Sequence, residues 1–282
     1  MYINEKNYKN IDFVVGEKFY DIANSIFSSN SPENGNDDYN QLQNTFNIDN
    51  HKEYNIVYLH TMYKNQFFDY IRNMNKKFII ITHNSDINID SVSNLPDNVI
   101  KWYSQNVNCK DDRLYSLPIG LENSRWFPNV KKQDLILNKL SENKNIKNLV
   151  YMNHNMATNI KERRSPYRLL QDKSFVTTEF GENGKNFENY IDNVYNHKFV
   201  ICPMGNGIDT HRKWETLYLK TIPIEKRCIN SSYYEDLPIC LVESWEEITE
   251  EFLEREYSRI TNSHWNLDKL HMWYWQNEIC KL

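Results

Sequence analysis

A short polar segment near position 210 has residue types and spacing that suit a phosphate group. It contains two glycines, which let backbone approach a ligand closely, and side chains that donate or accept hydrogen bonds. The set is Gly205, Asn206, Gly207, Asp209, Thr210, His211, Arg212 and Glu215. Apolar runs predict a strand at 199–202, a helix at 210–219 and a strand at 221–224. Because a helix N-terminus offers free N–H groups and the positive end of the helix dipole, the segment is a candidate anion site.

The predicted helix at 210–219 has an apolar and a polar face. Asp209 or Thr210 is its expected N-cap. The apolar positions recur at intervals of three and four and predict a buried stripe of Trp214, Leu217, Tyr218 and Thr221. Arg212 and Glu215 point away from that stripe. A cation in the first turn is disfavoured unless an anion is bound, so we expect Arg212 to pair with a pyrophosphate and Glu215 to bind ribose hydroxyls. A solvated Arg–Glu pair, stabilising by about 0.3 kcal/mol, is the alternative.

Polar residues also follow apolar runs in the N-terminal half. The runs at 55–60, 77–82, 99–104 and 114–121 each end in polar side chains, among them Gln105 and Asn106. The carboxyl ends of parallel strands share one edge of a sheet, where ligands bind. A hydroxyl that acts as a nucleophile needs a general base within about 3 Å. The candidates are Asp86, His83 and Glu122, with Asp86 and His83 ranked first because they share one loop. The alternative is that these residues form turns and helix caps.

Short apolar runs that alternate with helical stretches predict an α/β chain built of parallel βαβ units. The clearest strand is KFIIIT at 77–82, and the composition changes near 143–148. We therefore expect an N-terminal unit over 1–146, a second unit over 147–260 and a C-terminal helix within 261–282. That last helix is expected to pack back on the N-terminal unit.

Composition excludes several functions. The net charge of the 282 residues is −5, which argues against non-specific nucleic-acid binding. No apolar run reaches the ~18 residues of a membrane span, and the first ten residues hold no apolar stretch of a signal peptide. The five cysteines are odd in number and far apart, and the histidines lack metal-ligand spacing. A soluble, cytoplasmic protein without a metal site is expected.

Two segments resemble exostosin-like glycosyltransferases. The first runs over 199–249 and includes FVICPMGNGIDTHRKWETLYLKTIPI and YYEDLPICLVESWEEIT. The second is YMNHN at 151–155 with Arg163, similar to the strand and loop that open the donor domain of these enzymes. Together the matches cover about 149–253. The chain departs from the family at Lys220 and Thr221, where small residues are usual, and the N-terminal half matches only loosely.

This resemblance implies a GT-B fold, in which two Rossmann-like domains face each other across a cleft. It implies an inverting, metal-independent transfer of a sugar from a nucleotide-sugar, a UDP-sugar being favoured, to a glycan hydroxyl. Asn153 and Arg163 would join the segment at 205–215 in binding the donor, and the base would come from the N-terminal domain. The missing membrane anchor is typical of a bacterial or viral version.

Three alternatives stay open. The first is a GDP-sugar-dependent enzyme similar to fucosyltransferases. The second is a glycan- or nucleotide-binding protein of the same fold without activity. The third is another Rossmann-like enzyme, such as a dehydrogenase, although no G-x-G-x-x-G follows an early strand.

Overall fold

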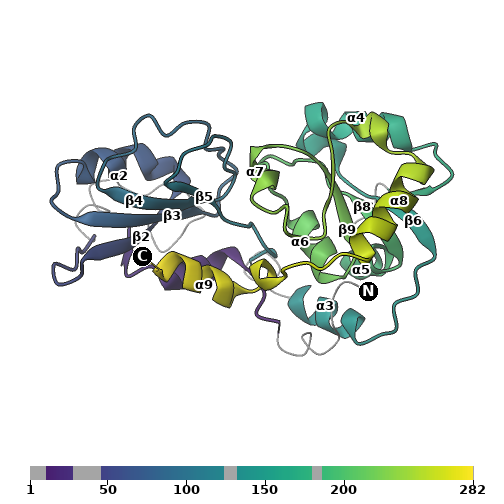
Figure 1. The fold of residues 1–282 in the computed structure, drawn as a ribbon, viewed down its shortest axis with the longest axis horizontal. Coiled ribbons are helices and arrows are strands. Elements are labelled where there is room, and N and C mark those ends of the chain that lie inside the picture. Colours follow the sequence, from purple (N-terminus) through teal and green to yellow (C-terminus); the bar gives the residue numbers. More distant parts are fainter. Residues whose placement is uncertain (1–10, 28–45, 124–131, 180–185, 282) are drawn as a thin grey trace.

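Two parallel sheets of five strands form the framework of the chain (Figure 1). The computed structural model describes residues 11–27, 46–123, 132–179 and 186–281. The first sheet has the order β1-β2-β3-β4-β5. Its strands are β1 (Ser25–Ile26), β2 (Tyr54–His60), β3 (Lys77–His83), β4 (Val99–Ser104) and β5 (Leu114–Ser116). The predicted α/β class is confirmed, and β3 covers the run that the sequence indicates as its clearest strand.

The second sheet has the order β10-β9-β8-β6-β7, again with parallel neighbours. Its strands are β6 (Asn148–Met152), β7 (Val176–Thr178), β8 (His197–Ile201), β9 (Ile222–Lys226) and β10 (Cys240–Val242). β8 is the central strand, and Phe199, Val200 and Ile201 are fully buried in it. Such continuous apolar runs are typical of parallel strands covered on both faces.

Helices and 3-10 turns connect the strands of both sheets (Figure 1). The α-helices are α2 (Lys64–Ile71), α3 (Lys132–Leu140), α4 (Ile160–Leu170), α5 (Phe187–Tyr195), α6 (His211–Tyr218), α7 (Ile229–Ser232), α8 (Glu250–Thr261) and α9 (Met272–Cys280). The 3-10 turns are η2 (Gly16–Ile22), η3 (Thr61–Tyr63), η5 (Met156–Thr158), η7 (Trp245–Glu247) and η8 (Asp268–Leu270). No helix in the described part of the chain is long and apolar enough to cross a membrane.

One hydrophobic cluster contains residues from the neighbourhood of both sheets. It includes Val14 and Tyr103 from the N-terminal half and Trp214 and Tyr218 from α6. The hydroxyl of Tyr218 accepts a hydrogen bond from Val14 N (3.0 Å) and donates one to Leu270 O (2.8 Å). The two halves of the molecule therefore share part of their core.

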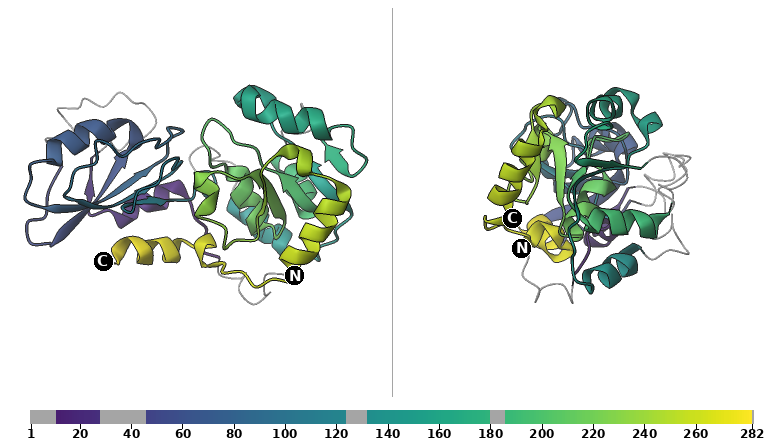
Figure 2. Two further views of the ribbon diagram at one scale, coloured as in Figure 1. Left: turned by 45° about the horizontal axis from the view of Figure 1, so that its top comes forward. Right: turned by 90° about the vertical axis from the view of Figure 1, so that its right-hand side faces the viewer.

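The last helix returns to the first sheet, as both views show (Figures 1 and 2). Tyr103 in β4 donates a hydrogen bond from its hydroxyl to Glu278 O at 2.9 Å. At the start of α9, Met272 N donates to Asp12 O at 2.8 Å. These contacts join the end of the described chain to its beginning.

Candidate functional site

The segment between β8 and α6 packs tightly against residues from other parts of the chain. A Cβ atom on Gly207 would lie 2.5 Å from Asn106 Nδ2, and one on Gly205 would lie 3.1 Å from Arg163 Nη2. The glycines were expected to let backbone approach a ligand, but in this structure their near neighbours are protein side chains. Asn206 is exposed and Thr210 is half-buried, at the N-cap of α6 without a side-chain capping bond.

Two arginines lie near the first turn of α6, close enough for their charges to interact. Arg163, on α4, donates from Nε to Met204 O (2.9 Å) and from Nη1 to Asn155 O (2.8 Å). Arg212 is the second residue of α6, and its buried Nη1 atom has no hydrogen-bond partner among the described residues. Burial and the charge of Arg212 lower the pKa of Arg163 to about 10. A buried guanidinium donor without an acceptor is costly, and a bound anion would supply the acceptor.

His154 lies beside this arginine pair, at the carboxyl end of β6. Its Nε2 donates to Arg163 O at 3.0 Å. Burial lowers its pKa to about 4, and the positive charges of Arg212 and Arg163 act in the same direction. His154 is therefore neutral near pH 7, and the positive charge here comes from the two arginines. Its neighbour Asn153 is buried and donates to Tyr151 Oη at 2.7 Å.

Glu215 is a buried carboxylate. Only 5% of the residue is exposed, so the alternative of a solvated Arg–Glu pair is wrong. Its Oε2 accepts a hydrogen bond from Tyr190 Oη (2.9 Å), and its Oε1 lies 3.3 Å from Lys132 Nζ. A ribose hydroxyl would have to share these oxygens. The predicted buried stripe is confirmed, because Trp214 and Leu217 are fully buried and Tyr218 and Thr221 are each 1% exposed.

Asp209 links the two halves and is saturated by protein donors. Its Oδ2 accepts from Ile119 N (2.7 Å) and from Trp214 Nε1 (2.8 Å). Its Oδ1 accepts from Thr210 N (3.0 Å) and lies 2.7 Å from Lys213 Nζ. With four donors around a side chain that is fully buried, Asp209 has an evident structural role. Its expected role in donor binding stays a prediction.

Lys213 is a buried charge that sequence reasoning missed. Its Nζ lies between Asp209 Oδ1 (2.7 Å) and Glu225 Oε2 (3.7 Å), and 4.6 Å from the centre of the Tyr234 ring. Burial disfavours its charged form, but the two carboxylates outweigh that effect and raise its pKa. The spacing of four residues between Asp209 and Lys213 is the signal that indicates such a pair.

Asn106, just after β4, connects this segment to the first sheet. Its Oδ1 accepts from Asp209 N and its Nδ2 donates to Ser85 O, both at 2.9 Å. Its φ of 57° lies in the left-handed region, which asparagine tolerates better than most residues. The carboxyl end of β4 is thereby fixed next to the loop that follows β8.

His83 and Asp86 occupy opposite environments. His83 is fully buried, its Nε2 donates to Pro118 O (2.9 Å) and its Nδ1 lies 3.3 Å from Asn84 Oδ1. Burial lowers the pKa of His83 to about 4. Asp86 is exposed in the loop after β3. The structure therefore does not bring the two residues ranked first into one accessible pair.

Glu122 lies against the start of α6. Its Oε1 is 3.4 Å from His211 Nε2, and His211 Nδ1 donates to Gly120 O at 2.8 Å. Burial disfavours the charged imidazole, but Glu122 outweighs this and the pKa of His211 is raised. His211 thus belongs with a first-half carboxylate, a contact that local sequence patterns do not reveal.

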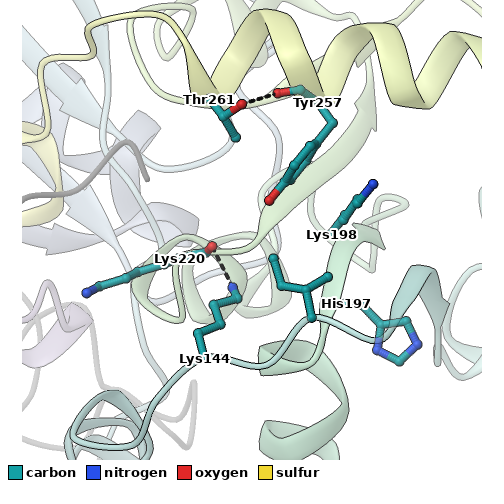
Figure 3. A pocket seen from close by; sticks show the side chains of 7 residues that line it. Lys144, His197, Lys198, Lys220, Tyr257 and Thr261 are labelled. Carbon is teal, nitrogen blue, oxygen red and sulfur yellow. Dashed lines mark hydrogen bonds between the residues drawn. The ribbon is translucent and has the colours of Figure 1, made fainter.

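A cavity of about 230 Å³ lies at the opposite end of β8 and α6 (Figure 3). Its lining includes Lys144, His197, Lys198 and Tyr257. Lys144 Nζ donates to Lys220 O at 2.6 Å, a bond that Figure 3 shows. The ammonium groups of Lys198 and Lys220 point away from the middle of the cavity (Figure 3). The lining does not include Arg163 or Arg212, so the cavity is distinct from the arginine pair.

Metal binding was not expected from the sequence. Within the described ranges, no three His, Cys, Asp or Glu side chains are arranged to hold a metal ion. The metal-independent mechanism stays a prediction.

No protein-family model matches the chain. No curated protein matches it significantly. Among solved structures, the chain is similar to an α,α-trehalose-phosphate synthase (UDP-forming) from Burkholderia vietnamiensis, at 8% sequence identity and a TM-score of 0.35. That match covers 80% of this chain and 70% of the other. A similarity this weak carries no argument about function, so the resemblance to exostosin-like enzymes stays a prediction.

Proposed function

We propose that this chain is a GT-B glycosyltransferase that moves a sugar from a nucleotide-sugar, a UDP-sugar being favoured, to a glycan hydroxyl. One observation carries the proposal. Within the described part of the chain, Arg212 Nη1 is buried without an acceptor, near Arg163 and at the N-terminus of α6. A diphosphate fits this arrangement, because it supplies charged acceptors for the arginines and for the free N–H groups of the helix.

The two arginines and the helix N-terminus would also stabilise the leaving group. In an inverting transfer, the bond between the anomeric carbon and the diphosphate oxygen breaks, and negative charge grows on the diphosphate. Arg163 and Arg212 would lie beside that charge, and side chains that are already held in place need little reorganisation as the charge develops. Fixed arginines would take the role that a metal ion takes in other transferases.

The domain division belongs to this proposal. The first sheet lies wholly within 1–146, the second within 147–260, and α9 within 261–282. A donor domain over 147–260 would carry the arginine pair. An acceptor-side domain over 1–146 would supply the base.

Substitution of Arg212 tests the proposal. Arg212→Ala should weaken UDP binding by about 10- to 100-fold, the effect of losing a hydrogen bond to a charged group. Titration calorimetry with UDP and GDP measures this directly. The matched control is Arg259→Ala, because Arg259 is an exposed residue of α8 whose Nη2 pairs with Glu256 at 2.8 Å.

Equal UDP affinity in wild type and Arg212→Ala would refute the proposed site. Tighter binding of GDP than of UDP would favour the GDP-sugar alternative. Binding of either nucleotide without release of UDP or GDP from any nucleotide-sugar would favour a binding protein without activity.

A further inference from the structure

The pair formed by Glu122 and His211 joins the two halves beside the proposed diphosphate site. Glu122 follows the last strand of the first sheet, and His211 is the first residue of α6. Their side chains are 24% and 28% exposed, respectively. Both side chains are therefore partly exposed to solvent, whereas His83 is fully buried.

The backbone around Gly120 fixes where Glu122 lies. Gly120 has a φ of 68°, and a Cβ atom there would lie 2.2 Å from Val14 O. Leu121 N donates to the same Val14 O at 2.8 Å. His211 contacts this segment twice, through the Gly120 carbonyl and through the Glu122 carboxylate. The imidazole thus holds both the backbone and the side chain of one short segment.

We propose that Glu122 is the catalytic base and that His211 is a positioning residue that holds it. This inference rests on the proposed function. The Glu122 carboxylate accepts the proton of the acceptor hydroxyl, and that oxygen forms a bond to the anomeric carbon. The bond from the anomeric carbon to the diphosphate breaks, and its electron pair leaves with the nucleoside diphosphate. Glu122 then releases its proton to solvent.

Two observations favour Glu122 over the other candidates. The base must lie across the anomeric carbon from the leaving diphosphate, hence within several ångströms of the arginine pair. Glu122 contacts His211, the residue next to Arg212 in the first turn of α6. His83 has both ring nitrogens against protein groups, and Asp86 lies in the exposed loop after β3.

His211 suits a positioning role because of the charges that face it. Glu122 and Glu215 raise its pKa, and the buried His83 is near enough to be affected by its charge. When the imidazole is protonated, Nδ1 donates to Gly120 O and Nε2 donates to Glu122. Charge-assisted bonds of this kind fix geometry more firmly than neutral ones. Donor binding and base orientation would then depend on consecutive residues of α6.

The test compares Glu122→Gln, His211→Gln and the double variant with wild type. UDP release from a panel of UDP- and GDP-sugars, with water or glycans as acceptors, gives the rate, and calorimetry gives UDP affinity. Glu122→Gln should lower kcat by about 100-fold or more and leave UDP affinity unchanged. His211→Gln should lower kcat when it is the only substitution, but it should cause no further loss of kcat when it is added to Glu122→Gln. A merely structural role would make the two losses add.

Rescue and controls complete the test. Formate should restore part of the activity of Glu122→Ala by supplying a carboxylate. Glu122→Asp keeps a carboxylate at this position and is used if the other variants fold poorly. Glu254→Gln, on α8, is the surface control. Full activity of Glu122→Gln would overturn this inference, and so would loss of activity in Asp86→Asn with Glu122→Gln unaffected. In either case, UDP binding by the wild type would leave the proposed function standing. No UDP binding and no turnover by wild type would overturn both.

Discussion

The surroundings of each histidine set its charge in this molecule. The pKa of His83 falls from 6.5 to about 4, chiefly because the side chain is fully removed from water. The pKa of His211 moves the other way, because Glu122 lies beside it. Two histidines that are close enough to interact thus hold different charges near pH 6, and the sequence alone gives both the same ordinary pKa.

His83 makes the stability of the fold depend on pH. Its folded pKa of about 4 lies below the unfolded value of 6.5, so between these values the unfolded chain binds more protons. The contribution of neutral His83 to the free energy of unfolding is complete above pH 6.5 and is lost as the pH falls to about 4. The loss is on the order of 3 kcal/mol. His83→Gln should flatten this loss. Urea unfolding of variant and wild type across that range measures it, and parallel pH dependences would contradict the assignment.

Helix α6 is held at both of its ends. At its start, Asp209 binds Ile119 N at 2.7 Å. At its end, Lys144 Nζ donates to Leu219 O (3.1 Å) and Lys220 O (2.6 Å). Lys220 has a φ of 56°, which ends the helix in the left-handed region. The proposed diphosphate site is therefore built on an element whose position is fixed from outside.

The loop before α6 allows a matched comparison of two glycines. An added Cβ on Gly207 would meet Asn106 Nδ2 at 2.5 Å, and Asn106 is bonded on both sides. Gly207→Ala should destabilise the fold by about 1–3 kcal/mol. Gly205→Ala should cost less, because its added Cβ lies 3.1 Å from the end of a long arginine side chain. Thermal unfolding of both variants tests the order, and an equal or reversed effect would refute it.

At the scale of the whole molecule, the two sheets are not independent. Phe13 and Tyr103 from the N-terminal half share a hydrophobic cluster with Trp214, Tyr218 and Trp275. Hydrogen bonds cross the same boundary, as between Ser116 Oγ and Tyr234 Oη at 3.0 Å. A shared core of this kind favours unfolding of both halves in one step.

Tyr218 provides the test of that cooperativity. Tyr218→Phe removes the acceptor of Val14 N and the donor to Leu270 O, and it should cost about 1–3 kcal/mol because a buried N–H loses its partner. The unfolding curve should shift without splitting. Tyr115→Phe is the control, because Tyr115 is 36% exposed and its hydroxyl donates to Asp112 O, three residues away. Two separate transitions in wild type would contradict a shared core.

The sequence predicts those features that depend on local periodicity. The apolar run at 77–82 coincides with β3, and the predicted stripe at 214, 217 and 218 is buried. Helix α6 also buries Lys213, Glu215 and Thr216, which the apolar spacing does not predict. The burial of Glu215 was not predictable, because Tyr190 on α5 and Lys132 on α3 enclose it. Asp209 meets Ile119 across 90 positions. No local pattern encodes which loop of one half will meet which helix of the other.

Because α9 returns to the first sheet, the order of synthesis differs from the order of assembly. Strands β1 to β5 leave the ribosome on the order of ten seconds before α9 does. During that time Phe13, Tyr103 and their neighbours lack the apolar cover that Met272 and Trp275 later provide. The nascent first half is therefore a candidate client for chaperones that bind exposed apolar surface. Substitutions near α9 would therefore affect the folding of the first half, which is synthesised earlier.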